Sequence, residues 1–228
     1  MNNLNNLNIF NNVNANYLEI QDISKLESII IKDGLITPIS FSVLNEFSQE
    51  QISLFCHKYA IYQLPILELI DFLKDKIGNS NAIEIGSGNG SIGRALGIKM
   101  TDNKMQEWDA IKAEYAAIKQ PVITYGKDIE LLDGISAIKK YNPEIVIATW
   151  VTHKWHEGMK SGNFWGVEEK ELFENGVKKY IHIGNELTHK EKPILKKYKV
   201  EKHYPNWLIS RSIQRAQNVI YEFTNELI

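Results

Sequence analysis

The sequence predicts an α/β fold: a doubly wound sheet of seven strands, mostly parallel with an antiparallel last strand, preceded by an N-terminal helical cap. Three observations predict it. After residue 79, apolar segments of strand length alternate with amphipathic segments of helix length. A glycine-rich turn, EIGSGNG, separates the first such strand from the first such helix. The last two strand-like segments have no clear helix between them, which indicates an antiparallel pair at one side of the sheet.

The chain before this sheet divides into two parts. Residues 1–18 contain an asparagine-rich stretch, MNNLNNLNIFNNVNAN, which is typical of a low-complexity disordered arm. Residues 19–79 have helical periodicity and are predicted to form the cap. Within it, Ser48 and Gln51 have the spacing of a capping box at a helix start. Residues 80–228 then form the sheet domain.

The elements of that domain follow in regular order. Strands are expected at 81–85, 98–102, 121–125, 144–151, 180–185, 199–204 and 218–223. Helices are expected at 91–97, 105–119, 134–141 and 168–179. The segment EIVIATWV is almost continuously apolar, as expected of a central parallel strand that is covered on both faces.

The composition indicates which partners and which cellular compartment to expect. The net charge of −2 indicates no basic field, so neither DNA nor a membrane surface is an expected partner. Cys56 is the single cysteine and lies in an apolar run, which favours a buried, inert thiol and a reducing compartment, the cytoplasm. The N-terminus lacks the basic and apolar regions of a signal peptide, and no apolar stretch reaches the length of a membrane span.

The glycine turn has two interpretations. Read from Glu84, the letters give acid-x-Gly-x-Gly-x-Gly, with glycines at Gly86, Gly88 and Gly90. This pattern is typical of a site for S-adenosylmethionine. Read from Gly88 and ending at Gly93, they give Gly-x-Gly-x-x-Gly, the pattern of a nicotinamide or flavin dinucleotide site.

Charge and spacing favour the first interpretation. Glu84 at the strand end suits a ligand with an ammonium and a sulfonium better than an anionic pyrophosphate. A dinucleotide site expects an acidic ribose partner about 20 residues after the turn. Asp102 comes only 14 positions after Gly88. Asp102 closes the second predicted strand and Asp128 follows the third, so with Glu84 they would place three acids at the carboxyl edge of the sheet.

At this point the chain resembles the class I S-adenosylmethionine-dependent methyltransferases, over roughly residues 81–223. EIGSGNG resembles their first motif, TDN and GKDI their ribose and adenine positions, and PEIVIATWV the strand that faces the donated methyl group. The resemblance implies a Rossmann-like fold and assigns 80–228 as the S-adenosylmethionine-binding methyltransferase domain. The cofactor-site residues that it implies are Glu84, Gly86, Ser87, Gly88, Asn89, Gly90, Asp102, Asn103, Lys127, Asp128, Ile129 and Trp150.

One departure from the family bears on the methyl acceptor. Enzymes of this fold that methylate amino groups of nucleic-acid bases carry a polar residue and Pro-Pro-aromatic after the fourth strand, whereas this chain has TWVTHKWH. It also has no cysteine there for attack on cytosine C5. A small-molecule acceptor is favoured, with protein and RNA left open. The lysine-rich segment 189–203 is interpreted as a solvated face.

The loop after the fourth strand supplies the catalytic candidates, His153 and His156. A histidine at the active edge of the sheet is able to act as a general base near neutral pH. The alternative is a loop histidine bonded to backbone. No third ligand accompanies the His-x-x-His spacing, so no metal site is expected. The predicted function is an S-adenosylmethionine-dependent methyltransferase; the alternatives are a non-catalytic cofactor-binding subunit and an NAD(P)-dependent oxidoreductase.

Overall fold

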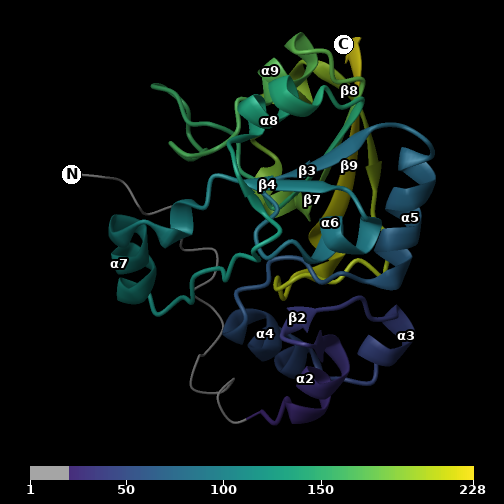
Figure 1. Cartoon of the computed structure of the whole chain (residues 1–228), viewed down its shortest axis with the longest axis vertical. Coiled ribbons are helices and arrows are strands. Elements are labelled where there is room, and N and C mark those ends of the chain that lie inside the picture. The colour runs from purple at the N-terminus through teal and green to yellow at the C-terminus, as the bar shows by residue number, and fades with distance from the viewer. Residues whose placement is uncertain (1–20) are drawn as a thin grey trace.

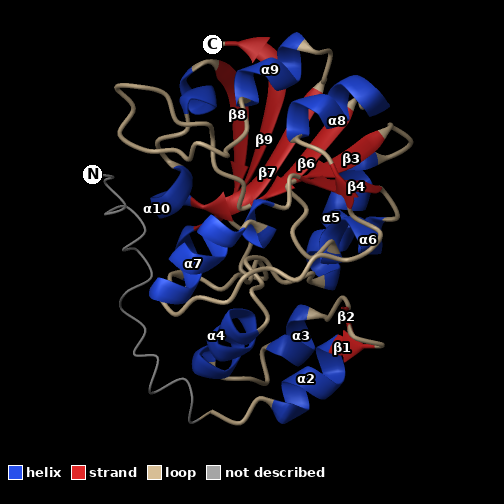
Figure 2. Cartoon of the chain, turned by 60° about the vertical axis from the view of Figure 1, so that its left-hand side comes forward, coloured by secondary structure: helices blue, strands red, loops and turns tan. Residues whose placement is uncertain are grey.

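A computed structural model describes residues 21–228, in which a twisted sheet carries helices on both faces and a helical cap at one end (Figures 1 and 2). The predicted arm, residues 1–18, lies outside the described residues. Among the described residues, none of the helices combines the length and the apolar composition that a bilayer span requires.

The main sheet has seven strands in the order β5-β4-β3-β6-β7-β9-β8. Their bounds are β3 Ala82–Ile85, β4 Lys99–Asp102, β5 Glu130–Leu131, β6 Ile145–Thr149, β7 Lys179–Asn185, β8 Tyr198–His203 and β9 Asn218–Leu227. The first five in this order pair in parallel, whereas β9 pairs antiparallel with both β7 and β8. The predicted Rossmann-like sheet with its antiparallel last strand is confirmed.

The helices of the sheet domain are α5 Leu67–Ile77, α6 Ser91–Leu96, α7 Asp109–Ala117, α8 Gly134–Tyr141, α9 Glu169–Glu174 and α10 Glu186–His189. Short 3₁₀ turns lie at Met105–Glu107, Pro193–Lys196 and Arg215–Gln217. In Figure 2, α8 and α9 lie on one side of the sheet, and α5 and α6 lie on the other. The predicted helix at 105–119 is divided into the first 3₁₀ turn and α7, whereas α10 and the other two 3₁₀ turns are not predicted from the sequence.

The cap contains α2 Ser24–Ile30, α3 Phe41–Leu44 and α4 Gln49–Lys58, and also a two-stranded hairpin that the sequence does not predict, β1 Ile31–Lys32 with β2 Leu35–Ile36. The predicted capping box is confirmed: the Gln51 amide donates to Ser48 Oγ over 3.1 Å, and the Ser48 amide donates to Gln51 Oε1 over 2.9 Å. Cys56 is fully buried, and burial raises the pKa of its thiol to about 12, as the inert interpretation requires.

Strand β6 divides the apolar core into two layers. Ile145 and Ile147 pack with the cap and α5, whereas Val146 and Ala148 pack with α8 and α9. This alternation follows from the two-residue period of a strand, and it explains why the segment is apolar at every position. The first layer is continuous from the cap to the sheet.

The predicted strand at 121–125 is wrong. These residues form a loop, and the strand beside β4 is β5, paired through Thr101 with Glu130 and through Asp102 with Leu131. Pro121 has no amide hydrogen to donate to a ladder. The apolar side chains of this segment serve another purpose, because Ile123 packs over the glycine turn.

Candidate active site

The glycine turn joins β3 to α6 through three left-handed residues. Gly86, Gly88 and Gly90 have φ values of 57°, 56° and 73°, a region that costs other L-residues free energy. A Cβ on Gly86 would lie 2.5 Å from Val151 Cγ2. The first glycine is therefore required by a close contact with the loop that follows β6.

The fourth glycine has a different role. A Cβ on Gly93 would lie 2.5 Å from Met100 Cγ and 2.6 Å from Glu84 Oε2. Gly93 therefore allows α6 to pack closely on β3 and β4. This is the part that the last glycine plays in dinucleotide sites as well, so it does not discriminate between the two cofactors.

The backbone amides of the turn are largely used within the protein. Gly88 N donates to Asp102 Oδ2 over 2.9 Å, and Gly93 N donates to Glu84 Oε2 over 2.8 Å. Three further amides donate to protein oxygens: Ser87 N to Thr101 O, Gly90 N to Ser87 O, and Ser91 N to Asn89 Oδ1. A pyrophosphate would need such amides for itself.

Glu84 is the penultimate residue of β3 and is completely buried. Burial raises the pKa of its carboxyl group to about 8, while the bond from the Gly93 amide acts in the opposite direction. A contact with the Thr149 side chain is a smaller cause that also lowers the pKa, but among the described residues the Oε1 atom has no partner at ordinary hydrogen-bond geometry. A buried carboxyl group with one unsatisfied oxygen is an unfavourable arrangement that a ligand donor or cation would relieve.

Asp102 ends β4 beside the turn, as predicted, and is 7% exposed. Its carboxylate accepts from the Gly88 amide over 2.9 Å and from the Lys104 amide over 2.7 Å. Burial raises its pKa, and these bonds oppose the increase. The side chain of Asn103 accepts from the Met105 amide over 3.1 Å.

Asp128 does not follow a strand, which corrects the expected set of three acids at strand ends. It precedes β5 and forms a two-pronged ion pair with Arg94, with Nε–Oδ2 and Nη2–Oδ1 distances of 2.8 and 2.9 Å. Hydrogen bonding to Arg94 lowers its pKa. Of its neighbours, Lys127 is exposed, whereas Ile129 is buried and lies 3.1 Å from the position of a Cβ on Gly90.

Two residues that the sequence does not single out lie close to this turn. A Cβ on Gly88 would lie 3.4 Å from Ile123 Cδ1. The Ile123 amide donates to Gln106 Oε1 over 2.8 Å. Tyr125 lies near Asp102. Burial raises the pKa of the Tyr125 hydroxyl, and the negative charge of Asp102 raises it further. The apolar pattern of this segment predicts a strand, although it marks a loop that packs over the turn.

Trp150 follows β6 directly, whereas the sequence predicts it near the end of the strand at 144–151, and it has a φ of 58°. This conformation is strained for a bulky residue, and such strain is concentrated at functional sites. The indole Nε1 donates to Gln63 Oε1 over 3.4 Å, and the ring lies 6.2 Å from the Tyr62 ring and 5.5 Å from the His189 ring. Gln63 and Tyr62 come from the cap, so no local pattern in the sequence connects them with this site.

His153 and His156 lie in the loop between β6 and α9. His153 is 8% exposed, and its Nε2 lies 3.1 Å from the Ser161 carbonyl oxygen; burial lowers its pKa. His156 Nε2 lies 2.5 Å from Glu168 Oε2. Both histidines line a pocket with residues of α9 and of the 3₁₀ turn at Pro193–Lys196. The glycine turn does not contribute to the lining of this pocket.

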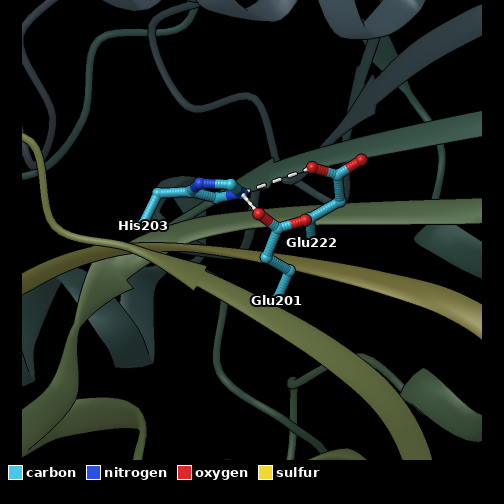
Figure 3. A group of neighbouring side chains, drawn as sticks. All are labelled: Glu201, His203 and Glu222. Atoms are coloured by element: carbon cyan, nitrogen blue, oxygen red, sulfur yellow. Dashed lines mark hydrogen bonds and ion pairs between the residues drawn. The ribbon is translucent and has the colours of Figure 1, made fainter.

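The described residues contain one group with the ligand types of a metal site: Glu201, His203 and Glu222 on β8 and β9 (Figure 3). Glu222, however, accepts from Lys76 over 2.7 Å and from Lys179 over 2.8 Å. Two ammonium groups on the central carboxylate oppose a bound cation. We interpret the group as an ion-pair network.

Comparison with known proteins finds likenesses among solved structures only. No family model and no curated protein matches the sequence. Among solved structures, a putative methyltransferase complexed with SAH has 8% identity and a TM-score of 0.37, over 69% of this chain and 48% of that one. The chain thus spans about half the length of that protein.

Two other solved structures cover their own chains almost completely. An rRNA methylase from Streptococcus thermophilus has 15% identity and a TM-score of 0.38, over 69% of this chain and 94% of that one. A putative caffeoyl-CoA O-methyltransferase from Staphylococcus aureus has 12% identity and a TM-score of 0.38, over 92% and 99%. At such low identities and TM-scores, these likenesses do not indicate what this chain binds or does.

Proposed function

We propose that this chain is an S-adenosylmethionine-dependent methyltransferase. The observation that carries the proposal is the pair of buried carboxyl groups, Glu84 and Asp102, held against a turn of left-handed glycines. Glu84 Oε1 has no hydrogen-bond partner among the described residues. A cationic ligand beside Glu84 would lower its pKa and favour the carboxylate, whereas an anionic ligand would not.

The residues present fit this cofactor. Val151 occupies the space beside Gly86, but a Cβ on Gly88 would meet only the end of the Ile123 side chain, at 3.4 Å, so a ligand is able to approach the backbone at Gly88. Asp102 keeps acceptor capacity for a ribose diol, because each carboxylate oxygen has two lone pairs and accepts one backbone amide. Asp128 is the weakest member of the predicted set, since Arg94 already engages both of its oxygens.

When bound, S-adenosylmethionine supplies an electrophilic methyl group on a sulfonium. The protein's part in such chemistry is alignment and the exclusion of water. Trp150 and Tyr62 are placed to do this at the edge of β6, and Val151 joins that edge to the turn through its contact with Gly86. Their aromatic rings and the near-neutral charge of the chain favour a small-molecule acceptor.

The oxidoreductase alternative is less well supported. The turn amides that would bind a pyrophosphate donate instead to Asp102 and Glu84. The sheet also inserts the antiparallel β9 beside β7, where the dinucleotide-binding order 3-2-1-4-5-6 has a parallel strand. Calorimetric titration with S-adenosylmethionine and with NAD separates the two, and tighter binding of NAD would overturn our proposal.

Proton transfer by His153 or His156 remains a prediction. Each histidine already contacts a protein oxygen, the Ser161 carbonyl for His153 and the Glu168 carboxylate for His156. Screening extract fractions with methyl-labelled cofactor would first identify an acceptor. With that acceptor, His153→Ala and His156→Ala are compared for turnover; a general base contributes about 10²- to 10⁴-fold, and a loop histidine contributes nothing to turnover.

The ribose assignment predicts the effect of Asp102→Asn. We expect affinity for S-adenosylmethionine to fall about ten- to a hundredfold, because hydrogen bonds to a charged acceptor contribute about 1.5–3 kcal/mol each. Asp133→Asn is the matched control: Asp133 also accepts two backbone amides, those of Ile135 and Ser136, but it caps α8. Equal affinities of the two variants by calorimetry would remove Asp102 from the cofactor site.

A further inference from the structure

A buried ion pair lies behind the loop that follows β6. Lys192 Nζ lies 2.6 Å from Glu169 Oε1, with side chains that are 0% and 2% exposed. The Tyr180 hydroxyl donates to the same oxygen over 2.8 Å. Lys192 thus departs from the solvated face expected for the lysine-rich segment 189–203. Burying two charges carries a large desolvation cost, so the pair calls for an explanation other than stability.

Two donors from this network converge on a single backbone oxygen. Lys192 Nζ donates to the Val151 carbonyl over 2.8 Å, and His182 Nε2 lies 2.9 Å from the same oxygen. His182 is completely buried, and burial holds its pKa well below the ordinary value. The ring is therefore neutral, with its Nε2 hydrogen directed at the carbonyl.

The Val151 carbonyl lies between two contacts that shape the proposed site. On one side is Trp150, with its left-handed φ of 58° and its amide donating to the Ile183 carbonyl over 2.7 Å. On the other side, the Val151 side chain fills the space where a Cβ on Gly86 would lie, 2.5 Å from its Cγ2. A carbonyl held in one position therefore restrains both the Trp150 indole and the Val151 side chain that packs on Gly86.

We infer that Lys192 and His182 are positioning residues: together they hold the Val151 carbonyl, so that Val151 keeps its contact with Gly86 and Trp150 keeps its contacts with Gln63 and Tyr62. Glu169 supplies the opposite charge beside the buried Lys192 ammonium. The inference rests on the proposed function only for its consequence, cofactor affinity. The placement of Trp150 is a property of the chain alone.

The experiment compares Glu169→Gln with the double variant Lys192→Met, Glu169→Gln. Both remove the buried carboxylate, and the glutamine amide still offers an oxygen to the Tyr180 hydroxyl. In the single variant Lys192 is able to lose its proton, because burial lowers its pKa, and the neutral amine still donates to Val151. The double variant lacks that donor. Its difference from Glu169→Gln therefore reports the contact with the carbonyl and not the ion pair.

The readout is the indole NH spectrum of the five tryptophans, with the Trp150 signal assigned from Trp150→Phe. We expect the Trp150 signal to shift or broaden in the double variant and to stay in place in Glu169→Gln, while the other signals stay in place in both. Affinity for S-adenosylmethionine should fall about tenfold further in the double variant. An unchanged Trp150 signal in the folded double variant would overturn the inference.

A second variant keeps the test decisive if the double variant fails to fold. His182→Phe removes the other donor and keeps an aromatic ring against Tyr221 and His189. We expect the same displacement of the Trp150 signal, and its absence would contradict the inference. If the wild-type protein binds no S-adenosylmethionine, the proposed function fails, but the Trp150 signal still decides the positioning role.

Discussion

Gly88→Val is expected to weaken the binding of S-adenosylmethionine at least a hundredfold while the protein remains folded. The variant places a branched side chain on the turn, where the cofactor must approach the backbone, at a φ of 56° that valine rarely adopts. A hundredfold loss corresponds to about 2.7 kcal/mol. The fold is expected to survive, because the nearest atom to the new Cβ is the end of the Ile123 side chain at 3.4 Å. Calorimetry measures the affinity, and circular dichroism checks the fold.

Gly97→Val is the matched control for this variant. Gly97 ends the same helix, α6, has a φ of 70°, and would place a Cβ in open space, with nothing within 4 Å. The substitution therefore introduces comparable backbone strain at the far end of the helix from the turn. We expect a similar loss of stability with nearly unchanged affinity. If both variants bind as the wild type does, the glycine turn does not hold the cofactor.

The sheet could be predicted because its signals are local. The strands β3, β6 and β7 have apolar residues at most of their inner positions, and each strand is buried almost completely. The missed strand β5 has only two residues and lies at the sheet edge, with Leu131 66% exposed. It carries no hydrophobic signal, whereas the neighbouring segment 121–125 does, because that segment packs over the glycine turn. Burial in a loop and burial in a strand leave similar patterns in the sequence.

The proposed cofactor side of the site was more predictable than the proposed acceptor side. Glu84, the glycines and Asp102 lie within 19 consecutive residues of one strand–turn–helix–strand unit, so their spacing in the sequence fixes their geometry. Gln63 and Lys192 reach the edge of β6 from the cap and from beyond β7. Contacts across such separations arise from the tertiary fold, and no spacing rule reveals them. The burial of Lys192 could not be predicted from composition either, because its neighbours in the lysine-rich segment are mostly exposed.

Glu84→Gln is expected to stabilise the protein at alkaline pH while weakening the binding of S-adenosylmethionine. In the folded protein the Glu84 pKa is about 8, against an ordinary value of 4.5, because the carboxyl group is buried. Between these two values the folded state retains a proton that the unfolded state has lost. The contribution of Glu84 to stability is therefore full below about pH 4.5 and is lost as the pH rises to about 8. The loss is at most roughly 5 kcal/mol.

Glutamine cannot ionise, so the variant does not incur this loss, and its amide oxygen is still able to accept from the Gly93 amide. The free energy of unfolding, measured with urea from pH 5 to pH 9, should therefore favour the variant increasingly with rising pH and then level off. Glu144→Gln is the control, because Glu144 is exposed and its pKa is lowered by hydrogen bonding to Lys178. Its difference from the wild type should not grow over this range. If the difference in the free energy of unfolding between Glu84→Gln and the wild type stays constant with pH, Glu84 is ionised in the folded protein without a ligand. The raised pKa of Glu84 would then be wrong.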